Sequence, residues 1–340
     1  MVEKKPLISV VLPVYNVALY IEESVASILN QTVTDFELLI IDDCSTDNTL
    51  SIIEEIKDNR IKIITKEKNS GLIHSLNLGF KLAKGKYIAR MDGDDISVNN
   101  RFEKQLEVLE NDSNVKVCGC WLQEFGKSNR LVRHKEYHEE IKARLLLSCS
   151  MSMGAVMLER EWIGNVLFDA TKKHVEDYDF WSRIAWTGKF YNIQEPLYLY
   201  RVHEMQVSTQ YKSIQLQGDI EIKLFLFKKL KYDSEIFPDE LIAKVLLLDK
   251  HIQVKELVLF IKWLKELILL NNKQNVFSEH ELKKVLNEML QSLLFTLYFK
   301  PTDIGINKKW RIKALFKLPF KNASFILKLK SREVYKLLFK

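Results

Sequence analysis

The sequence predicts an α/β fold with a mostly parallel sheet flanked by helices, followed by an α-helical C-terminal region. Three observations lead to this prediction. Short apolar runs without polar alternation, such as residues 7–12 and 36–41, are typical of strands buried on both faces of a parallel sheet. Amphipathic helical patterns lie between these runs over the first hundred residues, as in a parallel α/β sheet. Beyond about residue 212 only long helical patterns remain.

Apolar periodicity sets the limits of the expected elements. Strands are expected at residues 7–12, 36–41, 61–64, 115–118 and 154–158, in a short run from Tyr87, and in a segment that ends near His203. Helices are expected at 21–30, 50–56, 71–85, 102–109 and 139–147, from Glu176 onward, and at 213–232, 239–271 and 278–298. We therefore expect two domains, residues 1–212 and residues 213–340.

The composition is that of a folded globular protein, with 47% apolar and 28% charged residues among 340. The net charge of +6 is unevenly placed, because residues 301–340 carry eleven Lys or Arg against two acidic residues, a local charge of +9. Four scattered cysteines are too few for a disulfide framework, and Cys118-Gly-Cys120 lacks the spacing of a zinc site. This cysteine usage indicates a reduced, cytoplasmic compartment.

Neither a signal peptide nor a membrane span is expected. The chain begins Met-Val-Glu-Lys-Lys-Pro and continues directly into a predicted strand. The most apolar C-terminal run, residues 257–270, is interrupted by Lys262, Lys265 and Glu266. We expect a chain that is soluble or bound at a membrane surface.

Acidic residues follow two strands of the predicted sheet. Asp92, Asp94 and Asp95 lie within four residues of one another, and Asp42 and Asp43 follow an earlier strand. The carboxyl ends of parallel strands share one edge of a sheet, where such folds bind ligands. Carboxylates there could hold Mg²⁺ or Mn²⁺ and accept hydrogen bonds from a nucleoside. The alternative is an acidic turn and a helix N-cap.

Five motifs resemble those of family 2 glycosyltransferases with the GT-A fold, in the order found in that family. They are Pro13-Val14-Tyr15-Asn16, Ser27-Ile28-Leu29-Asn30-Gln31-Thr32, Asp42-Asp43-Cys44-Ser45-Thr46-Asp47, Asn69-Ser70-Gly71-Leu72 and Asp92-Gly93-Asp94-Asp95. The resemblance covers about residues 6–205. It implies a nucleotide-sugar donor, a divalent metal and inversion at the anomeric carbon. The dinucleotide and P-loop glycine motifs do not occur after the first strand.

The resemblance also implies roles for individual residues. Pro13, Tyr15 and Asp43 would hold the uridine, and Asp92 the ribose or the diphosphate. Asp94 would be the main ligand of a Mn²⁺ or Mg²⁺ ion. The family usually has glycine where this chain has cysteine after Asp43, and a small residue is expected to suffice for that turn.

A further acidic pair, Glu176-Asp177, begins an aromatic-rich amphipathic helix. It resembles the Glu-Asp motif of the family, whose aspartate is the general base, so we expect Asp177 to remove the proton of the acceptor hydroxyl. The alternative is favourable charge at a helix N-terminus, worth about 0.3–1 kcal/mol.

Arg201 and His203 end a later strand, near the position of an Arg-x-His segment that is common in the family. Arg201 is expected to offset the charge of the diphosphate, and His203 to complete the metal shell or bind a phosphate. A purely structural histidine is the alternative.

The last forty residues interleave lysines with Trp310, Phe316, Phe320 and Phe325. A basic, aromatic-rich amphipathic segment of this kind is typical of binding to a membrane surface. The alternative is a helix packed on the preceding helices with a solvated lysine face. Nucleic acid is not an expected partner, because no binding motif accompanies the charge.

The predicted function is metal-dependent, inverting transfer of a hexose from a nucleotide diphosphate sugar, a UDP-sugar in the first instance. The acceptor would be a cell-surface glycan such as lipopolysaccharide or capsule, or a lipid-linked oligosaccharide, reached from the cytoplasmic face of the membrane. Two alternatives stay open. A nucleotidyltransferase would carry a glycine- and lysine-rich triphosphate loop, which residues 13–18 do not form. A non-catalytic, membrane-docked GT-A scaffold would not need the carboxylates of Asp92, Asp94 and Asp177.

Overall fold

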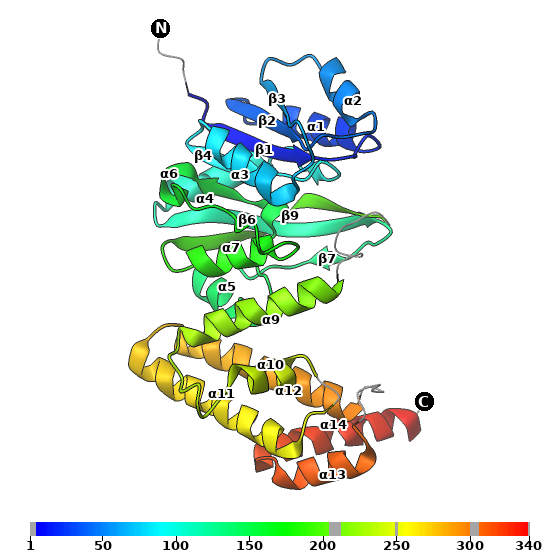
Figure 1. Cartoon of the computed structure of the whole chain (residues 1–340), viewed down its shortest axis with the longest axis vertical. Helices are drawn as coiled ribbons and strands as arrows, with labels where there is room; N and C mark the ends of the chain where they lie inside the picture. The colour runs from blue at the N-terminus through cyan, green and yellow to red at the C-terminus, as the bar shows by residue number, and fades with distance from the viewer. Residues whose placement is uncertain (1–4, 204–211, 249–250, 300–305, 339–340) are drawn as a thin grey trace. The chain divides into compact units, whose positions relative to one another are not determined.

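The structure, a computed structural model, describes residues 5–203, 212–248, 251–299 and 306–338. The chain divides into two compact units, residues 1–218 and 219–340 (Figure 1). The first unit contains the sheet and the second is helical. Each unit is considered separately below.

The first unit is built on one sheet with the strand order β3-β2-β1-β4-β8-β6-β9-β5, and β7 pairs with β6. The strands are β1 (Ile8–Val14), β2 (Phe36–Asp42), β3 (Ile61–Thr65), β4 (Tyr87–Arg90), β5 (Ile96–Ser97), β6 (Val115–Gly126), β7 (Leu131–Val132), β8 (Met157–Glu159) and β9 (Lys189–Val202). The first four strands are mutually parallel, and so are β6 and β9, whereas β8 runs antiparallel to both of its neighbours. The predicted mostly parallel α/β sheet is confirmed.

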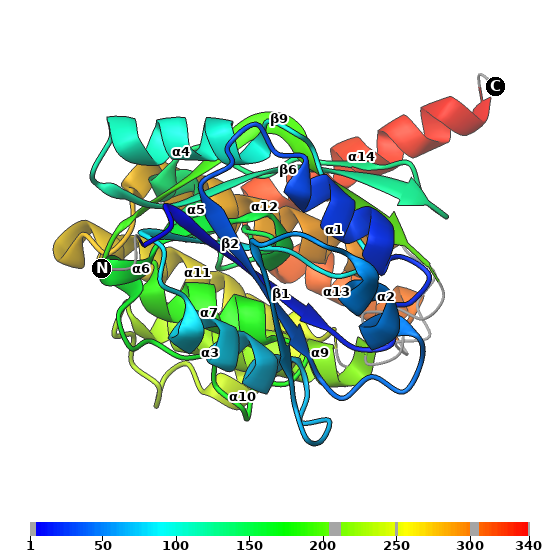
Figure 2. The same ribbon diagram turned by 90° about the horizontal axis from the view of Figure 1, so that it is seen from above.

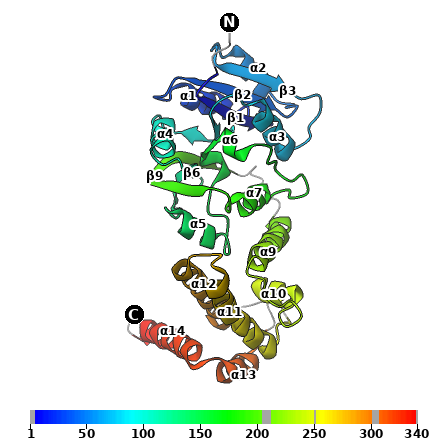
Figure 3. The same ribbon diagram turned by 90° about the vertical axis from the view of Figure 1, so that its left-hand side faces the viewer.

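Helices cover both faces of this sheet. In the view of Figure 2, α1 (Ile21–Leu29) and α4 (Arg101–Asn111) lie on one side, and α3 (Leu72–Leu82) and α7 (Glu176–Ile184) on the other; Figure 3 agrees. Every residue of β1 and β2 is buried, as their unbroken apolar runs predicted. The remaining short elements of this unit are α2 (Thr49–Glu55), α5 (His138–Arg144), α6 (Arg160–Ile163) and a 3₁₀ turn at Met153–Ala155.

Two long strands were only partly predicted. β6 has 12 residues and β9 has 14, and they pair along most of their length with shifts of register. Both strands mix buried with half-buried positions, so that much of their sequence lacks the continuous apolar run of a central strand. β9 returns the chain to β5, which directly follows the acidic run at residues 92–95.

The second unit contains the helical patterns, but the expected helix at 239–271 is wrong. The helices, the first of which begins before the unit boundary, are α9 (Lys212–Lys228), α10 (Asp239–Leu246), α11 (Val254–Gln274), α12 (Glu279–Phe299), α13 (Lys308–Lys317) and α14 (Phe320–Leu338). α10 ends before Leu248, whose φ of 57° is left-handed. A capping box of Gln253 and Glu256 then begins α11. The indole of Trp263, fully buried, packs against Phe227 with ring centroids 4.7 Å apart.

Candidate active site

The two acidic segments lie at the same edge of the sheet, on either side of β1. In the register of the sheet, Val14 of β1 pairs with Asp42 of β2, and Val11 pairs with Arg90 of β4. The strands β2 and β4 are therefore second neighbours with β1 between them. This edge is the place where open α/β sheets bind ligands.

The loops after β1 and β2 are joined by the side chain of Asn16. Its Oδ1 accepts a hydrogen bond from the backbone N–H of Thr46 at 2.8 Å, and its own φ is 52°. Asparagine tolerates this left-handed conformation better than most residues. The adjacent Pro13 is buried at the end of β1, whereas Tyr15 is 45% exposed. An aromatic ring is therefore accessible beside the loop after β2.

Asp43 holds the loop before α3. Its carboxylate accepts hydrogen bonds from the backbone N–H groups of Ser70 at 2.9 Å and Gly71 at 2.7 Å, and from Lys66 Nζ at 2.5 Å. Gly71 has a φ of 89°, which favours glycine at this turn. The buried carboxylate of Asp43 thus joins the Asp42-Asp43 and Asn69-Ser70-Gly71 motifs directly.

Cys44 has a φ of 62°. This conformation explains why glycine is usual at the position, since a Cβ atom costs roughly 1–2 kcal/mol in the left-handed region. The turn therefore places a requirement on the backbone angle in addition to any requirement on the size of the side chain.

The acidic run after β4 carries a high density of negative charge. Burial, together with the charges of Asp92 and Asp94, raises the pKa of Asp95 to about 8. Burial and the charge of Asp92 also raise the pKa of Asp94. Asp95 accepts a hydrogen bond from the backbone N–H of Arg201 at 2.7 Å. A cation near these carboxylates would relieve their repulsion.

His203 and Arg201 both contact Asp94. His203 Nε2 lies 2.9 Å from Asp94 Oδ2, and Arg201 Nε donates to the backbone carbonyl of Asp94 at 2.7 Å. The Arg201 guanidinium also lies over the rings of Tyr20 and Phe125, at 4.7 and 4.4 Å from their centroids. The segment at the end of β9 is therefore held directly over the acidic run.

A divalent ion suits Asp94 and His203 as a carboxylate and an imidazole ligand, because Mn²⁺ accepts both types. The described residues contain no group of three or more His, Cys, Asp or Glu side chains arranged around one point. Two protein ligands are enough for an ion that takes its remaining ligands from water and substrate phosphates, as Mg²⁺ commonly does.

Arg90 is a buried cation beside Asp92. Its guanidinium pairs with Asp92 Oδ2, and the backbone N–H of Asp92 donates to Tyr198 Oη at 3.1 Å. Gly154 closes the group, since a Cβ at this position would lie 2.6 Å from Asp92 Oδ2 and 2.7 Å from Tyr198 Oη. Burial is the largest single effect on the pKa of Arg90 and lowers it, but the charges of Asp92, Tyr198 and Asp95 and the hydrogen bond to Asp92 together raise this pKa overall.

Glu176 and Asp177 begin α7, as predicted. Burial and the charge of Asp177 raise the pKa of Glu176 to about 7, and burial also raises the pKa of Asp177. The charge of Arg90 acts in the opposite direction on both groups. Asp177 Oδ1 accepts a hydrogen bond from the backbone N–H of Tyr178 at 2.7 Å, so Asp177 also contributes to the helix start. Its other oxygen lies 3.8 Å from Cys149 Sγ.

Comparison with known proteins identifies the family. The sequence profile of Glycosyl transferase family 2 matches residues 9–168. An uncharacterised glycosyltransferase of Haemophilus influenzae is 32% identical over 277 residues, which cover 76% of this chain and 86% of that protein. The chain belongs to glycosyltransferase family 2. Another relative, the Escherichia coli UDP-Glc:alpha-D-GlcNAc-diphosphoundecaprenol beta-1,3-glucosyltransferase WfgD, is 30% identical over 63% of this chain and 85% of its own length.

Solved structures confirm the GT-A fold of this glycosyltransferase. S. aureus TarS 1–349 in complex with UDP-GlcNAc superposes with a TM-score of 0.58 at 17% identity, covering 92% of this chain and 93% of that one. The Pyrobaculum calidifontis mannosyltransferase PcManGT, in complex with GDP-Man and Mn²⁺, has a TM-score of 0.50 at 15% identity, covering 98% and 88%.

Three residues at the site of this glycosyltransferase were not singled out from the sequence. Arg90 and Tyr198 lie in strands, next to apolar residues in the sequence. Gly154 lies in a turn, where a strand was expected. The sequence did hold one indication of the role of Arg90: it is the single charged residue of the otherwise apolar β4. A buried charge in a folded protein is normally paired, so a partner for Arg90 could have been expected.

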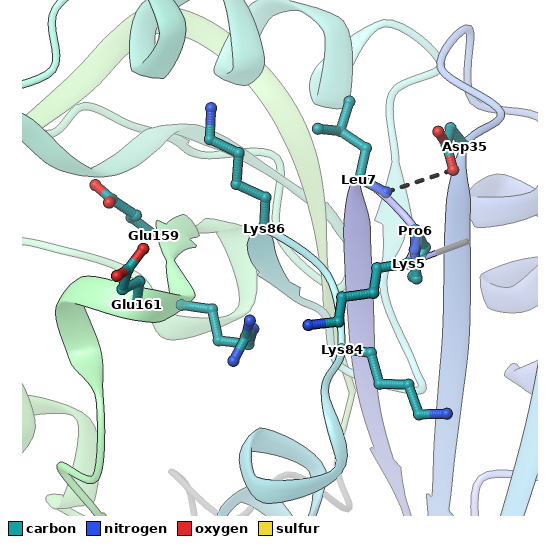
Figure 4. Close-up of a pocket in the computed structure, with 9 residues that line it drawn as sticks. Lys5, Pro6, Leu7, Asp35, Lys84, Lys86, Glu159 and Glu161 are labelled. Atoms are coloured by element: carbon teal, nitrogen blue, oxygen red, sulfur yellow. Dashed lines mark hydrogen bonds between the residues drawn. The ribbon is translucent and has the colours of Figure 1, made fainter. Parts of the chain in front are cut away.

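The enzyme also has a cavity of about 370 Å³ at the opposite edge of the sheet, lined by residues that precede β1, β2 and β4 and by residues near the end of β8 (Figure 4). Lys86 on its wall forms an ion pair with Glu110 at 2.7 Å. Glu159 and Glu161 lie together on one side of it and Lys5, Lys84 and Lys86 on the other, and none of the predicted site residues lines it. We assign it no role in sugar transfer.

Proposed function

We propose that this glycosyltransferase transfers a hexose from a UDP-sugar to a cell-surface glycan or lipid-linked acceptor, with inversion and with a divalent metal. The observation that carries the proposal is the position of Arg90, which pairs with Asp92 and also acts on the Glu176-Asp177 pair. The charge of Arg90 thus acts both on Asp92, which we propose binds the nucleotide sugar, and on the pair that contains the proposed general base. The names of WfgD and of the TarS complex support a UDP-sugar donor.

The donor would bind at the edge of β1, β2 and β4. The exposed ring of Tyr15 would stack on the uracil, beside Pro13 and Asp43. Three hydrogen bonds already fix the Asp43 carboxylate, and a carboxylate can accept about four, so one position would remain for the base. Asp92 would hold the ribose or the diphosphate.

Asp94 and His203 would hold a Mn²⁺ or Mg²⁺ ion, which would stabilise the charge of the leaving diphosphate when bound. Arg201 would approach the same charge from the end of β9. Its contacts with the Asp94 carbonyl and two aromatic rings keep its guanidinium in place and reduce the entropy lost on binding.

The Asp177 carboxylate would accept the proton of the acceptor hydroxyl. The acceptor oxygen would attack the anomeric carbon as the bond to the diphosphate breaks, in one displacement that inverts the centre. Arg90 supports this role because its charge favours the ionised form of Asp177, which burial disfavours. A base with a pKa raised toward neutrality is well matched to proton transfer near pH 7.

The acceptor would lie at the cytoplasmic face of the cell membrane, with the basic C-terminal region as the contact to that surface. None of the described helices combines the length with the apolar composition of a membrane span. The acceptor in the name of WfgD, a diphosphoundecaprenol-linked sugar, supports a lipid-linked substrate.

Hydrolysis of a panel of nucleotide sugars with Mn²⁺ tests the proposal, because it identifies the donor without the acceptor. We expect release of UDP from one UDP-sugar, and loss of this release in Asp94→Ala. Release of pyrophosphate from nucleoside triphosphates would instead identify a nucleotidyltransferase. If no sugar nucleotide is bound or hydrolysed, the non-catalytic scaffold would be the correct reading.

A further inference from the structure

The turn between α13 and α14 exposes two phenylalanines. Phe316 is 84% exposed and Phe320 is 88% exposed, whereas Leu318 between them is buried. Lys313 and Lys317, in the second half of α13, and Lys321, at the start of α14, are also exposed. We refer to Phe316, Phe320 and these three lysines as the α13–α14 surface.

Packing within the second unit does not account for these phenylalanines. Other residues of the two helices satisfy that packing: Ala314 and Ile326 are buried, and Trp310 Nε1 donates to the carbonyl of Ile252 at 2.8 Å. Arg311 Nε donates to the carbonyl of Leu297 at 2.9 Å. Packing on the preceding helices thus explains the buried face of α13 and α14. It does not explain why the α13–α14 surface is exposed to water.

The charge around this surface has one sign. Residues 306–330 contain eight Lys or Arg and no Asp or Glu. A second copy of the chain would bring the same positive charge against it, which disfavours self-association. Large apolar side chains inside a basic rim complement a surface that is anionic outside and apolar beneath, and an anionic lipid membrane has both properties.

We propose that the α13–α14 surface docks on an anionic lipid membrane, with Phe316 and Phe320 inserted at the boundary between headgroups and acyl chains. Lys313, Lys317 and Lys321 contact the lipid phosphates around them. Removing two aromatic rings from water and bringing cations to a negative surface both favour this state. This inference specifies which residues make the membrane contact of the proposed function. It rests on the proposed function only where it explains why the enzyme would bind a membrane, namely to reach its acceptor.

Vesicle binding by the full-length protein tests the inference. We expect co-sedimentation with phosphatidylglycerol–phosphatidylcholine vesicles, weaker binding at high salt, and little binding to phosphatidylcholine alone. The affinity of the double variant Phe316→Ser/Phe320→Ser for these vesicles should be lower than that of the wild type by at least about ten-fold. Its circular dichroism and melting temperature should match those of the wild type, because both rings are exposed.

Ile236→Ser is the matched control. Ile236 is 55% exposed in the same unit but lies beside acidic residues, so the variant should bind vesicles as the wild type does. Equal binding by the double variant and the wild type would overturn the inference, as would absence of wild-type binding or an equal loss in Ile236→Ser.

Two further measurements distinguish other occupants. A change of oligomeric state in the double variant, by light scattering, would identify the surface as an interface between copies. Loss of single-stranded DNA binding with vesicle binding intact would identify a nucleic-acid site, where exposed rings stack on bases. Either result overturns the inference. Since no donor or acceptor is present, these results are independent of the nucleotide-sugar hydrolysis that tests the proposed function.

Discussion

His203 Nε2 lies 2.9 Å from Asp94 Oδ2, across 109 residues of sequence. The contact depends on β9, which returns along β6 and pairs with β5 directly after the acidic run. Imidazole and carboxylate thus converge at the edge of the sheet where the donor is proposed to bind.

Asp94→Ala should abolish the dependence of UDP binding on Mn²⁺. The carboxylate is the proposed main ligand, and removing it leaves His203 without its partner. Calorimetric titration of UDP with and without Mn²⁺ measures the effect, and Asp112→Ala, at a half-buried position in the turn between α4 and β6, is the control. An Asp94→Ala protein that keeps the metal-dependent affinity would remove Asp94 from the metal site.

Asp177→Asn should slow sugar transfer by about 10²–10⁴-fold, the usual cost of losing a general base. Donor and metal binding should change far less than the rate, because Asp177 lies on α7 and is linked to the proposed nucleotide site through the charge of Arg90. The Asn side chain can still accept the hydrogen bond of the Tyr178 N–H, so melting should stay near that of the wild type. Early melting with normal turnover would show that Asp177 only stabilises the start of α7.

Arg90→Met should shift the acidic limb of the kcat–pH profile to higher pH. The charge of Arg90 lowers the pKa of Asp177 against the effect of burial, so its loss allows the base to hold its proton longer. Arg90→Lys keeps the positive charge, so the acidic limb of its kcat–pH profile should lie close to that of the wild type. Melting curves of both variants check the fold. If the two variants lose activity equally at all pH values, Arg90 acts by holding Asp92 rather than by its charge.

Glu176→Gln should change the dependence of stability on pH. The folded-state pKa of about 7 lies above the ordinary value, so the folded protein holds a proton that the unfolded chain releases. The stability from this proton is complete below the unfolded pKa and is lost as pH rises through about 7. The melting temperature of Glu176→Gln relative to wild type should therefore rise between about pH 5 and about pH 8. A constant difference across this range would contradict the raised pKa.

Cys44→Val should destabilise the protein beyond the cost that the Cβ atom of Cys44 already carries, because a β-branched residue is a poor fit at a φ of 62°. Cys44→Ala, which keeps the Cβ atom without branching, is the control and should stay near the wild type. Cys44→Gly should be at least as stable as the Ala variant, since relief of backbone strain offsets the greater entropy of unfolded glycine. Urea unfolding measures the series. Equal stability of the Val and Ala variants would show that the turn relaxes.

The sequence by itself determined the class of fold, the family and the positions of the acidic motifs. Buried strands and amphipathic helices have their own periods, and a carboxylate that follows a buried strand is visible in one dimension. The order of the five motifs added the family, and similarity to known proteins confirmed it.

The tertiary structure decided which distant groups meet. Arg90 ends an apolar strand, and its effect on Asp177 depends on where β4 and α7 lie, which no local spacing encodes. The helix α10 ends before Leu248, whose φ is left-handed, and helical periodicity does not predict that angle. Burial likewise separated Ile326, which is covered, from Phe316 and Phe320, which are not, because periodicity shows that a helix has an apolar face but not how much of it the fold will cover.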